Sequence, residues 1–216
     1  MNFGVLGTGI VGRTVASKLV ELGHEVTMGS RAAGNESAVG WAAETGERAH
    51  DGDFAAAASF GEVVVNATAG TASLEVLRAA GAESLAGKVV IDIANPLDFS
   101  KGMPPVLAVC NDDSLGERIQ REFADARVVK TLNTVNAEVM VDPVLVGGET
   151  DIFVCGDDED AKAQVTGLLG DFGWSSVVDL GDITAARGTE MYLALWLRLF
   201  AAKGTGHLNV KVISKA

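Results

Sequence analysis

Short runs rich in valine and isoleucine recur along the chain and alternate with segments whose apolar residues return every three or four positions. The runs are typical of strands buried in a parallel sheet, and the longer spacing is typical of amphipathic helices. The expected strands are residues 2–6, 25–30, 62–67, 88–94, 126–132, 151–156 and 175–180. The expected helices are residues 10–22, 36–45, 72–80, 115–124 and 158–172, with Asn35 and Asp113 as N-caps.

This alternation predicts an α/β fold, a Rossmann-like, doubly wound and mostly parallel sheet with a small C-terminal helical and β extension. We expect residues 1–180 to form a dinucleotide-binding domain and residues 181–216 to add a helix over 184–200 and a β-like tail, "HLNVKVI". That helix is apolar almost all round, so it must be buried against the domain, a second subunit, or both. A homodimer is the expected assembly.

The overall charge restricts the classes of partner. Asp and Glu number 29 against 17 Lys and Arg, and the net charge of −12 repels nucleic acid and anionic lipid. Cys110 and Cys155 lack the spacing of a metal site, and we expect both to be reduced thiols. We therefore expect neither a nucleic-acid partner nor a bound metal.

The chain opens on a strand-like run without the basic and hydrophobic regions of a signal peptide. Its longest apolar stretch, residues 191–202, is interrupted by Arg198 and falls short of the ~20 residues that cross a bilayer. The expected location is the cytoplasm, without membrane attachment.

A glycine motif, G-x-G-x-x-G, lies between the first expected strand and the first expected helix. Gly7 permits a tight turn, Gly9 lets the backbone approach a pyrophosphate, and Gly12 allows close packing of helix on sheet. The unpaired N–H groups at the start of such a helix bind anions. The motif predicts a dinucleotide site that includes Thr8, Ile10 and Val11; the alternative is a turn without a ligand.

The end of the second expected strand discriminates between the two nicotinamide dinucleotides. A carboxylate there binds the ribose 2′-hydroxyl, whereas a cation accepts a 2′-phosphate. The sequence has Ser30 and Arg31 at this point and no acidic residue. A charge-assisted hydrogen bond contributes ~1.5–3 kcal/mol, which favours NADP(H) over NAD(H). The alternative is a solvated surface arginine.

Small and polar residues also follow three later strands, where a ligand of an open α/β sheet lies. They could orient ribose, carboxamide or a second substrate, although such residues are common in loops. The expected cofactor contacts here are Thr68, Ala69, Gly70, Asn95 and Pro96, and the expected second-substrate contacts begin with Asn133, Thr134, Val135 and Asn136.

A positioned proton donor, which an alcohol or ketone dehydrogenase requires, is not evident. Tyr192 precedes Trp196 rather than a lysine at the four-residue spacing, and we expect Lys130 to face a partner or solvent. The three histidines are expected in a turn (His24), in a loop (His50) and near the C-terminus (His207). Hydride exchange between two rings needs alignment more than acid–base help, and it fits this composition better.

With these motifs in hand, the chain resembles the coenzyme F420-dependent NADP oxidoreductase family and the cytosolic reductase domain of the STEAP metalloreductases. The shared stretches keep their order and spacing over nearly the whole chain. They are "GTGIVG", "GSR", "DIANP", "VVKTLNTVNA", "VCGDD" and the terminal "RLF" helix.

This resemblance implies an enzyme that binds NADP(H) and exchanges hydride with a deazaflavin or a flavin, FMN or FAD. It implies that residues 133–136 lie beside the redox rings. The segment that contains His207 and Leu208 matches one that covers the deazaflavin in archaeal members. No catalytic acid or base is assigned.

Two departures from these families stand out. A lysine shortly after the Ser-Arg pair of archaeal members is absent from residues 32–36, and the membrane domain of the metalloreductases is absent. Two other functions stay open. One is a dehydrogenase of the 3-hydroxyacid or imine-reductase type, against which the short segment after Leu180 counts. The other is a non-catalytic NADP(H) sensor.

Overall fold

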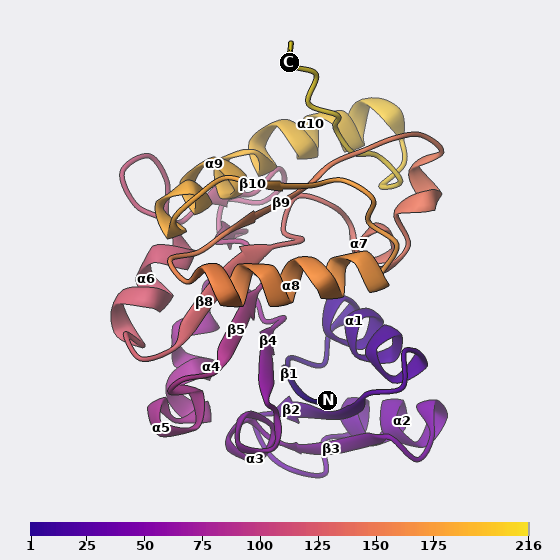
Figure 1. Ribbon diagram of the computed structural model, residues 1–216, viewed down its shortest axis with the longest axis vertical. Helices are drawn as coiled ribbons and strands as arrows, with labels where there is room; N and C mark the ends of the chain where they lie inside the picture. Colours follow the sequence, from indigo (N-terminus) through magenta and orange to yellow (C-terminus); the bar gives the residue numbers. More distant parts are fainter. Residues whose placement is uncertain (216) are drawn as a thin grey trace.

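A mostly parallel sheet with the strand order β10-β9-β8-β5-β4-β1-β2-β3 runs through the middle of the molecule (Figure 1). The computed structural model describes residues 1–215, and in that range the sheet has eight strands. They are β1 (Asn2–Leu6), β2 (Glu25–Ser30), β3 (Ala49–Asp53), β4 (Val63–Asn66), β5 (Val89–Asp92), β8 (Arg127–Thr131), β9 (Ile152–Cys155) and β10 (Val177–Asp179).

All neighbouring strands pair in parallel except β8 and β9, which pair antiparallel. Chain order reverses beside β1, because β2 lies on one side of it and β4 on the other. Such a reversal leaves a crevice at the carboxyl ends of the strands, where ligands of doubly wound sheets bind. A small antiparallel pair, β6 (Leu97–Asp98) and β7 (Val106–Leu107), follows β5.

Helices cover both faces of the sheet and divide the core into two apolar layers. One face carries α1 (Ile10–Glu21), α2 (Glu36–Thr45), α7 (Ala137–Val141) and α8 (Glu159–Asp171). The other carries α3 (Phe54–Phe60), α4 (Ser73–Ala80), α5 (Ala82–Leu85), α6 (Leu115–Glu122) and α9 (Ala186–Met191). The elements η1 (Pro143–Val146), η2 (Ile183–Ala185) and α10 (Leu193–Lys203) complete the described chain. The predicted Rossmann-like class is confirmed.

The predicted strands and the five predicted helices of the first 180 residues form within two residues of the expected limits. Asn35 caps α2 as expected, since its side chain accepts hydrogen bonds from two backbone N–H groups. The N-cap prediction at Asp113 is wrong. Ser114 caps α6 instead, while Asp113 forms ion pairs with Arg118 and Arg121.

Two elements between α2 and β4 were not predicted. The edge strand β3 is largely polar, and the alanine-rich α3 shows little periodicity, so neither has a strong apolar pattern. His50 consequently lies within β3 and not in a loop.

The C-terminal extension differs from its prediction. The expected helix over 184–200 is divided into η2, α9 and α10, which lie above β9 and β10 in Figure 1. The tail is not a strand. Its polar groups bond mainly to Asp151, whose carboxylate accepts from Lys211 Nζ at 2.7 Å and from the Val212 N–H at 2.6 Å. Side-chain bonds, together with the backbone bond from the Asp151 N–H to the Val210 carbonyl at 3.0 Å, take the place of a strand ladder.

The apolar surface of α10 is only partly covered within one chain. Leu193 is buried, whereas Leu195 and Phe200 are 53% and 44% exposed. Among the helices of residues 1–215, none combines the length and apolar composition that crossing a bilayer requires.

Candidate functional site

Two adjoining hollows lie at the carboxyl ends of the central strands. The turn hollow, of about 330 Å³, is bounded by the β1–α1 turn and the end of β2; the strand-end hollow, of about 240 Å³, lies over the ends of β4 and β5. Ala67, Thr68 and Ala69 line both hollows, which therefore adjoin along this segment; the two hollows together are called the groove. Besides Thr68 and Ala69, the predicted residues in the turn hollow are Gly7, Thr8, Gly9, Ser30 and Arg31.

The glycines of the turn differ in the space around them. Gly7 has a φ of +122°, and a Cβ there would lie 2.5 Å from the carbonyl oxygen of Ala67. A Cβ on Gly12 would lie 2.1 Å from the carbonyl oxygen of Gly7, so the helix packs on the turn through bare backbone. A Cβ on Gly9 would meet nothing within 4 Å. Gly9 thus borders open space in which a ligand can approach the backbone.

The start of α1 offers an uncompensated positive end to this space. Gly9 is its N-cap, and in the described chain no side chain caps the helix and no acidic residue lies in its first turn. The first N–H groups and the helix dipole together favour an anion. The side chain of Ile10 is 70% exposed, whereas Val11 lines the strand-end hollow.

Ser30 and Arg31 differ in their availability to a ligand. The buried hydroxyl of Ser30 donates to the carbonyl of Ala32 at 2.6 Å. Arg31 is exposed and forms no ion pair within residues 1–215, so its planar guanidinium is available for a phosphate. The ring of Phe54 lines the same hollow. This residue was missed because α3, which it begins, has little periodicity.

The strand-end hollow is lined without an ionisable side chain in the described chain. A Cβ on Gly70 would lie 2.1 Å from the carbonyl oxygen of Asn95, so this glycine lets two strand-end loops touch. The hollow includes Val11, Thr68, Ala69, Gly70, Asn95, Val135 and Asn136.

The amides of Asn95 and Asn133 bond to each other. Asn95 Nδ2 donates to the Asn133 carbonyl at 2.8 Å, and Asn133 Nδ2 donates to Asn95 Oδ1 and to the Thr189 carbonyl, both at 3.0 Å. Asn133 and Thr134 are buried behind the wall of the hollow. These amides therefore hold the loops together more directly than they could orient a ligand.

Asn136 and several other predicted residues bond to elements beside the groove, and most of them lie outside its lining. Asn136 does line the groove, but its Oδ1 also caps α7 by accepting the Val139 N–H. His207 pairs with Glu138 on α7, next to Gly206, whose Cβ position lies 2.7 Å from Asn136 Nδ2. The remaining predicted residues outside the lining of both hollows are Ile10, Gly12, Pro96 and Leu208.

Of the two environments predicted for Lys130, a partner or solvent, the structure shows partners and excludes solvent. Its side chain is fully buried, and Nζ lies 2.8 Å from Asp92 Oδ2 and 2.9 Å from Glu190 Oε1. The three residues come from β8, β5 and α9, and a single sequence offers no signal for such a pairing. A buried ammonium between two carboxylates satisfies the rule that buried charges are paired.

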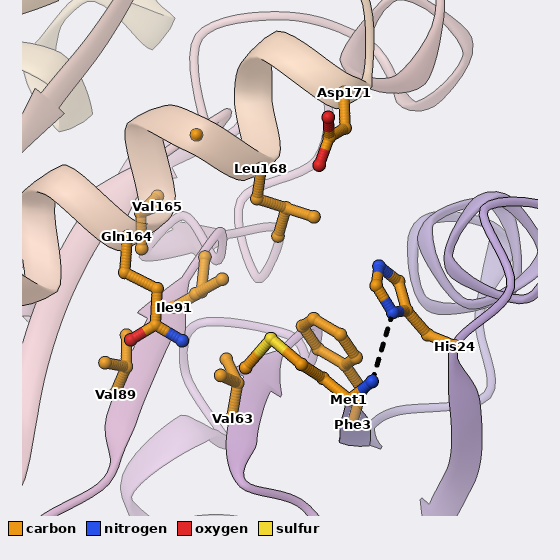
Figure 2. Close-up of a pocket in the computed structure, with 11 residues that line it drawn as sticks. Met1, Phe3, His24, Val63, Val89, Ile91, Gln164, Val165, Leu168 and Asp171 are labelled. Atoms are coloured by element: carbon orange, nitrogen blue, oxygen red, sulfur yellow. Dashed lines mark hydrogen bonds between the residues drawn. The ribbon is translucent and has the colours of Figure 1, made fainter.

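His24 and His50 lie at the opposite, amino-terminal edge of the sheet. A cavity of about 220 Å³ lies there. In Figure 2 the ring of His24 faces the amino group of Met1, and Leu168 of α8 lies above them. The His24 Nδ1 atom is 3.4 Å from that amino group. Burial, followed by the nearby amino group, lowers the pKa of His24. His50 bonds to Glu25 at 3.1 Å. Neither imidazole can reach the groove at the carboxyl ends.

Tyr192 is also unsuited to proton donation into the groove. Its hydroxyl is buried without a hydrogen-bond partner among the described residues, and burial raises its pKa. Residues 1–215 hold no group of three His, Cys, Asp or Glu side chains that could bind a metal ion.

Sequence comparison identifies relatives of two kinds. The profile of the family described as "NADP oxidoreductase coenzyme F420-dependent" matches residues 2–96. An F420-dependent NADP reductase from Methanocaldococcus jannaschii is 33% identical over 131 residues, 57% of each chain. Rattus norvegicus metalloreductase STEAP3 is 28% identical over 201 residues, 91% of this chain. The chain spans 57% and 36% of the length of these two relatives.

Solved structures give a longer match. Reductive aminase from Aspergillus terreus in complex with NADPH and ethyl-5-oxohexanoate has a TM-score of 0.68 at 20% identity, covering 93% of this chain and 63% of that one; this likeness concerns the fold. An Arthrobacter sp. FB24 protein described as a candidate F420-dependent NADP-reductase has a TM-score of 0.95 at 52% identity, covering 99% of this chain and 100% of that one. The chain therefore belongs to the coenzyme F420-dependent NADP oxidoreductases, a family of oxidoreductases.

Proposed function

We propose that the groove binds NADP(H) and that the protein transfers hydride between NADPH and a deazaflavin, coenzyme F420, or a flavin. One observation carries this proposal. The strand-end hollow, which adjoins the glycine turn, is lined without an ionisable side chain. Hydride exchange between two rings needs alignment more than acid–base help from the protein, and a lining without an acid or a base fits such a reaction.

The turn hollow suits the phosphorylated half of the dinucleotide. The N-terminus of α1 and the open backbone at Gly9 would hold the pyrophosphate, and Arg31 would hold the 2′-phosphate. The ring of Phe54 provides an apolar surface for adenine. Membership in a family described by NADP, and the NADPH complexes of proteins with this fold, support the choice of NADP(H).

The strand-end hollow suits the reacting half. The bound nicotinamide supplies the hydride, and the chain's own part is to position it and keep water away. Val11, Val135 and Met140 form apolar walls, while Gly70 lets the backbone approach closely. A substrate that must be protonated by the protein, such as an imine or a ketone, would find no donor in this lining.

The acceptor ring would lie on the outer side of this hollow, beside Val135 and Asn136. The segment after α10 runs next to it, because His207 pairs with Glu138 and Gly206 contacts Asn136. We expect His207 and Leu208 to cover the acceptor. FMN and FAD present the same ring chemistry as the deazaflavin and are tested beside it.

Hydride transfer is tested directly with purified protein. NADPH is mixed without oxygen with coenzyme F420, FMN or FAD in turn, and the nicotinamide absorbance is followed. Oxidation of NADPH that depends on protein and on one of these acceptors supports the proposal. Tight binding of NADPH without oxidation by any acceptor would favour a redox sensor instead.

We propose further that residues 181–216 attach to the domain through α9 and extend it toward a second copy of the chain. The exposed apolar side chains Leu195 and Phe200 of α10 are the surface that a partner would cover. Sedimentation equilibrium of the protein, compared with a Leu195→Glu variant, distinguishes a homodimer from a monomer.

A further inference from the structure

A buried chain of polar groups runs from α9 to the middle of the groove. Its inner part is Asp92, Lys130 and Glu190, all of which are at most 1% exposed. Lys130 Nζ donates to Asp92 Oδ2 at 2.8 Å, to Glu190 Oε1 at 2.9 Å and to the Ala94 carbonyl at 2.5 Å. All three protons of the ammonium group are thereby used.

Glu190, at the end of the chain of polar groups away from the groove, is held by the start of α6. Glu190 accepts the N–H groups of Leu115 and Gly116, the first two residues of α6, at 2.8 and 3.0 Å. Burial would lower the pKa of Lys130, but Asp92 and Glu190 outweigh burial and raise it. Both side-chain oxygens of Asp92 face donors, since Oδ2 accepts from Lys130 Nζ and Oδ1 accepts from the Ala94 N–H at 3.2 Å, so Asp92 acts toward its neighbours as a hydrogen-bond acceptor.

The acceptor role of Asp92 determines the orientation of the next group. Asn66 is fully buried, and its amide lies 2.8 Å from Asp92 Oδ1. Since Asp92 acts as an acceptor, the NH2 of Asn66 must point to it and Oδ1 must point away. Thr68 Oγ1 lies 2.7 Å from Oδ1 and must donate its proton there. The Ser73 hydroxyl lies 2.9 Å from Thr68 Oγ1 and 3.4 Å from the Ala69 carbonyl oxygen, so once Thr68 donates to Asn66, Ser73 donates to the nearer acceptor, Thr68.

We infer that Asp92 and Asn66 are positioning residues that fix the Thr68 hydroxyl as an acceptor toward the groove, where it binds a hydrogen-bond donor on the nicotinamide nucleoside. This inference rests on the proposed function. Thr68 lines both hollows and so lies where the two halves of the dinucleotide meet. A phosphate there would offer only acceptors, whereas the ribose hydroxyls and the carboxamide N–H offer donors.

The hydroxyl is tested with two substitutions and three probes in calorimetric titrations. Thr68→Val removes the hydroxyl at similar volume, and Thr68→Ser keeps it. We expect Thr68→Val to bind NADP⁺ about two- to tenfold more weakly than the wild type, as for the loss of one neutral hydrogen bond. Thr68→Ser should restore the affinity to within about twofold. Binding of 2′,5′-ADP, which lacks the nicotinamide nucleoside, should not change.

The group that donates to Thr68 is identified with the 3-acetylpyridine analogue of NADP⁺, which lacks the amide N–H. If Thr68→Val weakens binding of this analogue as much as binding of NADP⁺, the donor is a ribose hydroxyl. If Thr68→Val leaves the affinity for the analogue unchanged, the donor is the carboxamide. The inference is overturned if Thr68→Val leaves NADP⁺ affinity unchanged or weakens 2′,5′-ADP equally. Wild-type protein that fails to bind NADP⁺ would overturn the proposed function itself.

The buried network is tested by a double-mutant cycle. Asp92→Asn lets the Asn66 amide turn over, so Thr68→Val should cost less than about twofold in that background. Ser73→Ala is the matched control, since it leaves the bond to Asn66 and the full effect of Thr68→Val. A full effect in the Asp92→Asn background would contradict the inference.

Circular dichroism first establishes that each variant folds. If Asp92→Asn does not, Asn66→Ala replaces it in the cycle. Water admitted there both donates and accepts, so the polarity of Thr68 is no longer fixed. The same reduction of the Thr68→Val effect is expected, and its absence overturns the inference.

Discussion

Replacing Arg31 by alanine tests whether this side chain distinguishes NADPH from NADH. The guanidinium is exposed at the rim of the turn hollow and has no ion-pair partner within residues 1–215, so its removal breaks no contact of the fold. A charge-assisted hydrogen bond contributes ~1.5–3 kcal/mol, and solvent screening of an exposed group favours the lower value. We therefore expect NADPH to bind about tenfold more weakly.

NADH lacks the 2′-phosphate, so its affinity should change by less than about twofold. Both dinucleotides are titrated by calorimetry at fixed ionic strength, because screening depends on salt. Arg13→Ala is the matched control, since Arg13 is exposed on α1 and borders a different cleft. Arg13→Ala should change the affinity for neither NADPH nor NADH. Equal losses for NADPH and NADH in Arg31→Ala would refute this role of Arg31.

Three further changes test other parts of the account. Gly9→Ala should leave the melting temperature unchanged, because the new Cβ enters open space, and abolish detectable NADPH binding, because that space is where the pyrophosphate would lie. Gly12→Ala should lower the melting temperature, because its Cβ would lie 2.1 Å from a backbone oxygen. NADPH binding by folded Gly9→Ala would contradict the placement of the pyrophosphate at this turn. Cys155, whose pKa burial raises to about 12, should resist iodoacetamide at mildly alkaline pH while the less buried Cys110 reacts, as mass spectrometry of the peptides would reveal; modification of both at equal rates would contradict this. Burial raises the pKa of Asp151, but hydrogen bonds from Lys211, Ser176 and the Val212 N–H outweigh burial and lower it. The attachment of the segment after α10 is therefore complete above the ordinary aspartate pKa and is lost as the pH falls through the lowered value. Hydrogen exchange in that segment should rise in acid and, at neutral pH, in Asp151→Asn; no rise would show that another contact holds it.

The part of the fold that could be predicted is the part encoded by local pattern. The β1–α1–β2 unit combines a short apolar run, the glycine turn and a helix with apolar residues at three- and four-residue steps, and its limits follow from these features to within one residue. The strand β3 has no such pattern because it lies at the sheet edge, where polar side chains are tolerated. The antiparallel direction of β9 could not be predicted either, since the residue pattern of a short buried strand is the same in both directions.

The candidate site divides in the same way. The turn glycines and Arg31 were predictable because a known geometry requires these residue types at fixed spacing. The buried ion pairs of Lys130 were not, since its partners lie 38 and 60 residues away in sequence on other elements. Asn133 illustrates a further limit: its position after a strand was predicted, but its burial depends on α9 packing over it.

The most direct test of the account is the transfer of hydride from NADPH. The wild-type protein is mixed without oxygen with stoichiometric NADPH and coenzyme F420, FMN or FAD, and both the nicotinamide and the acceptor absorbance are recorded. We predict that NADPH is oxidised and that one acceptor is reduced in equal amount. With NADH in place of NADPH at the same concentration, Arg31→Ala and the wild type should reduce the acceptor equally well. NADPH that stays reduced in the presence of protein and all three acceptors would contradict the account.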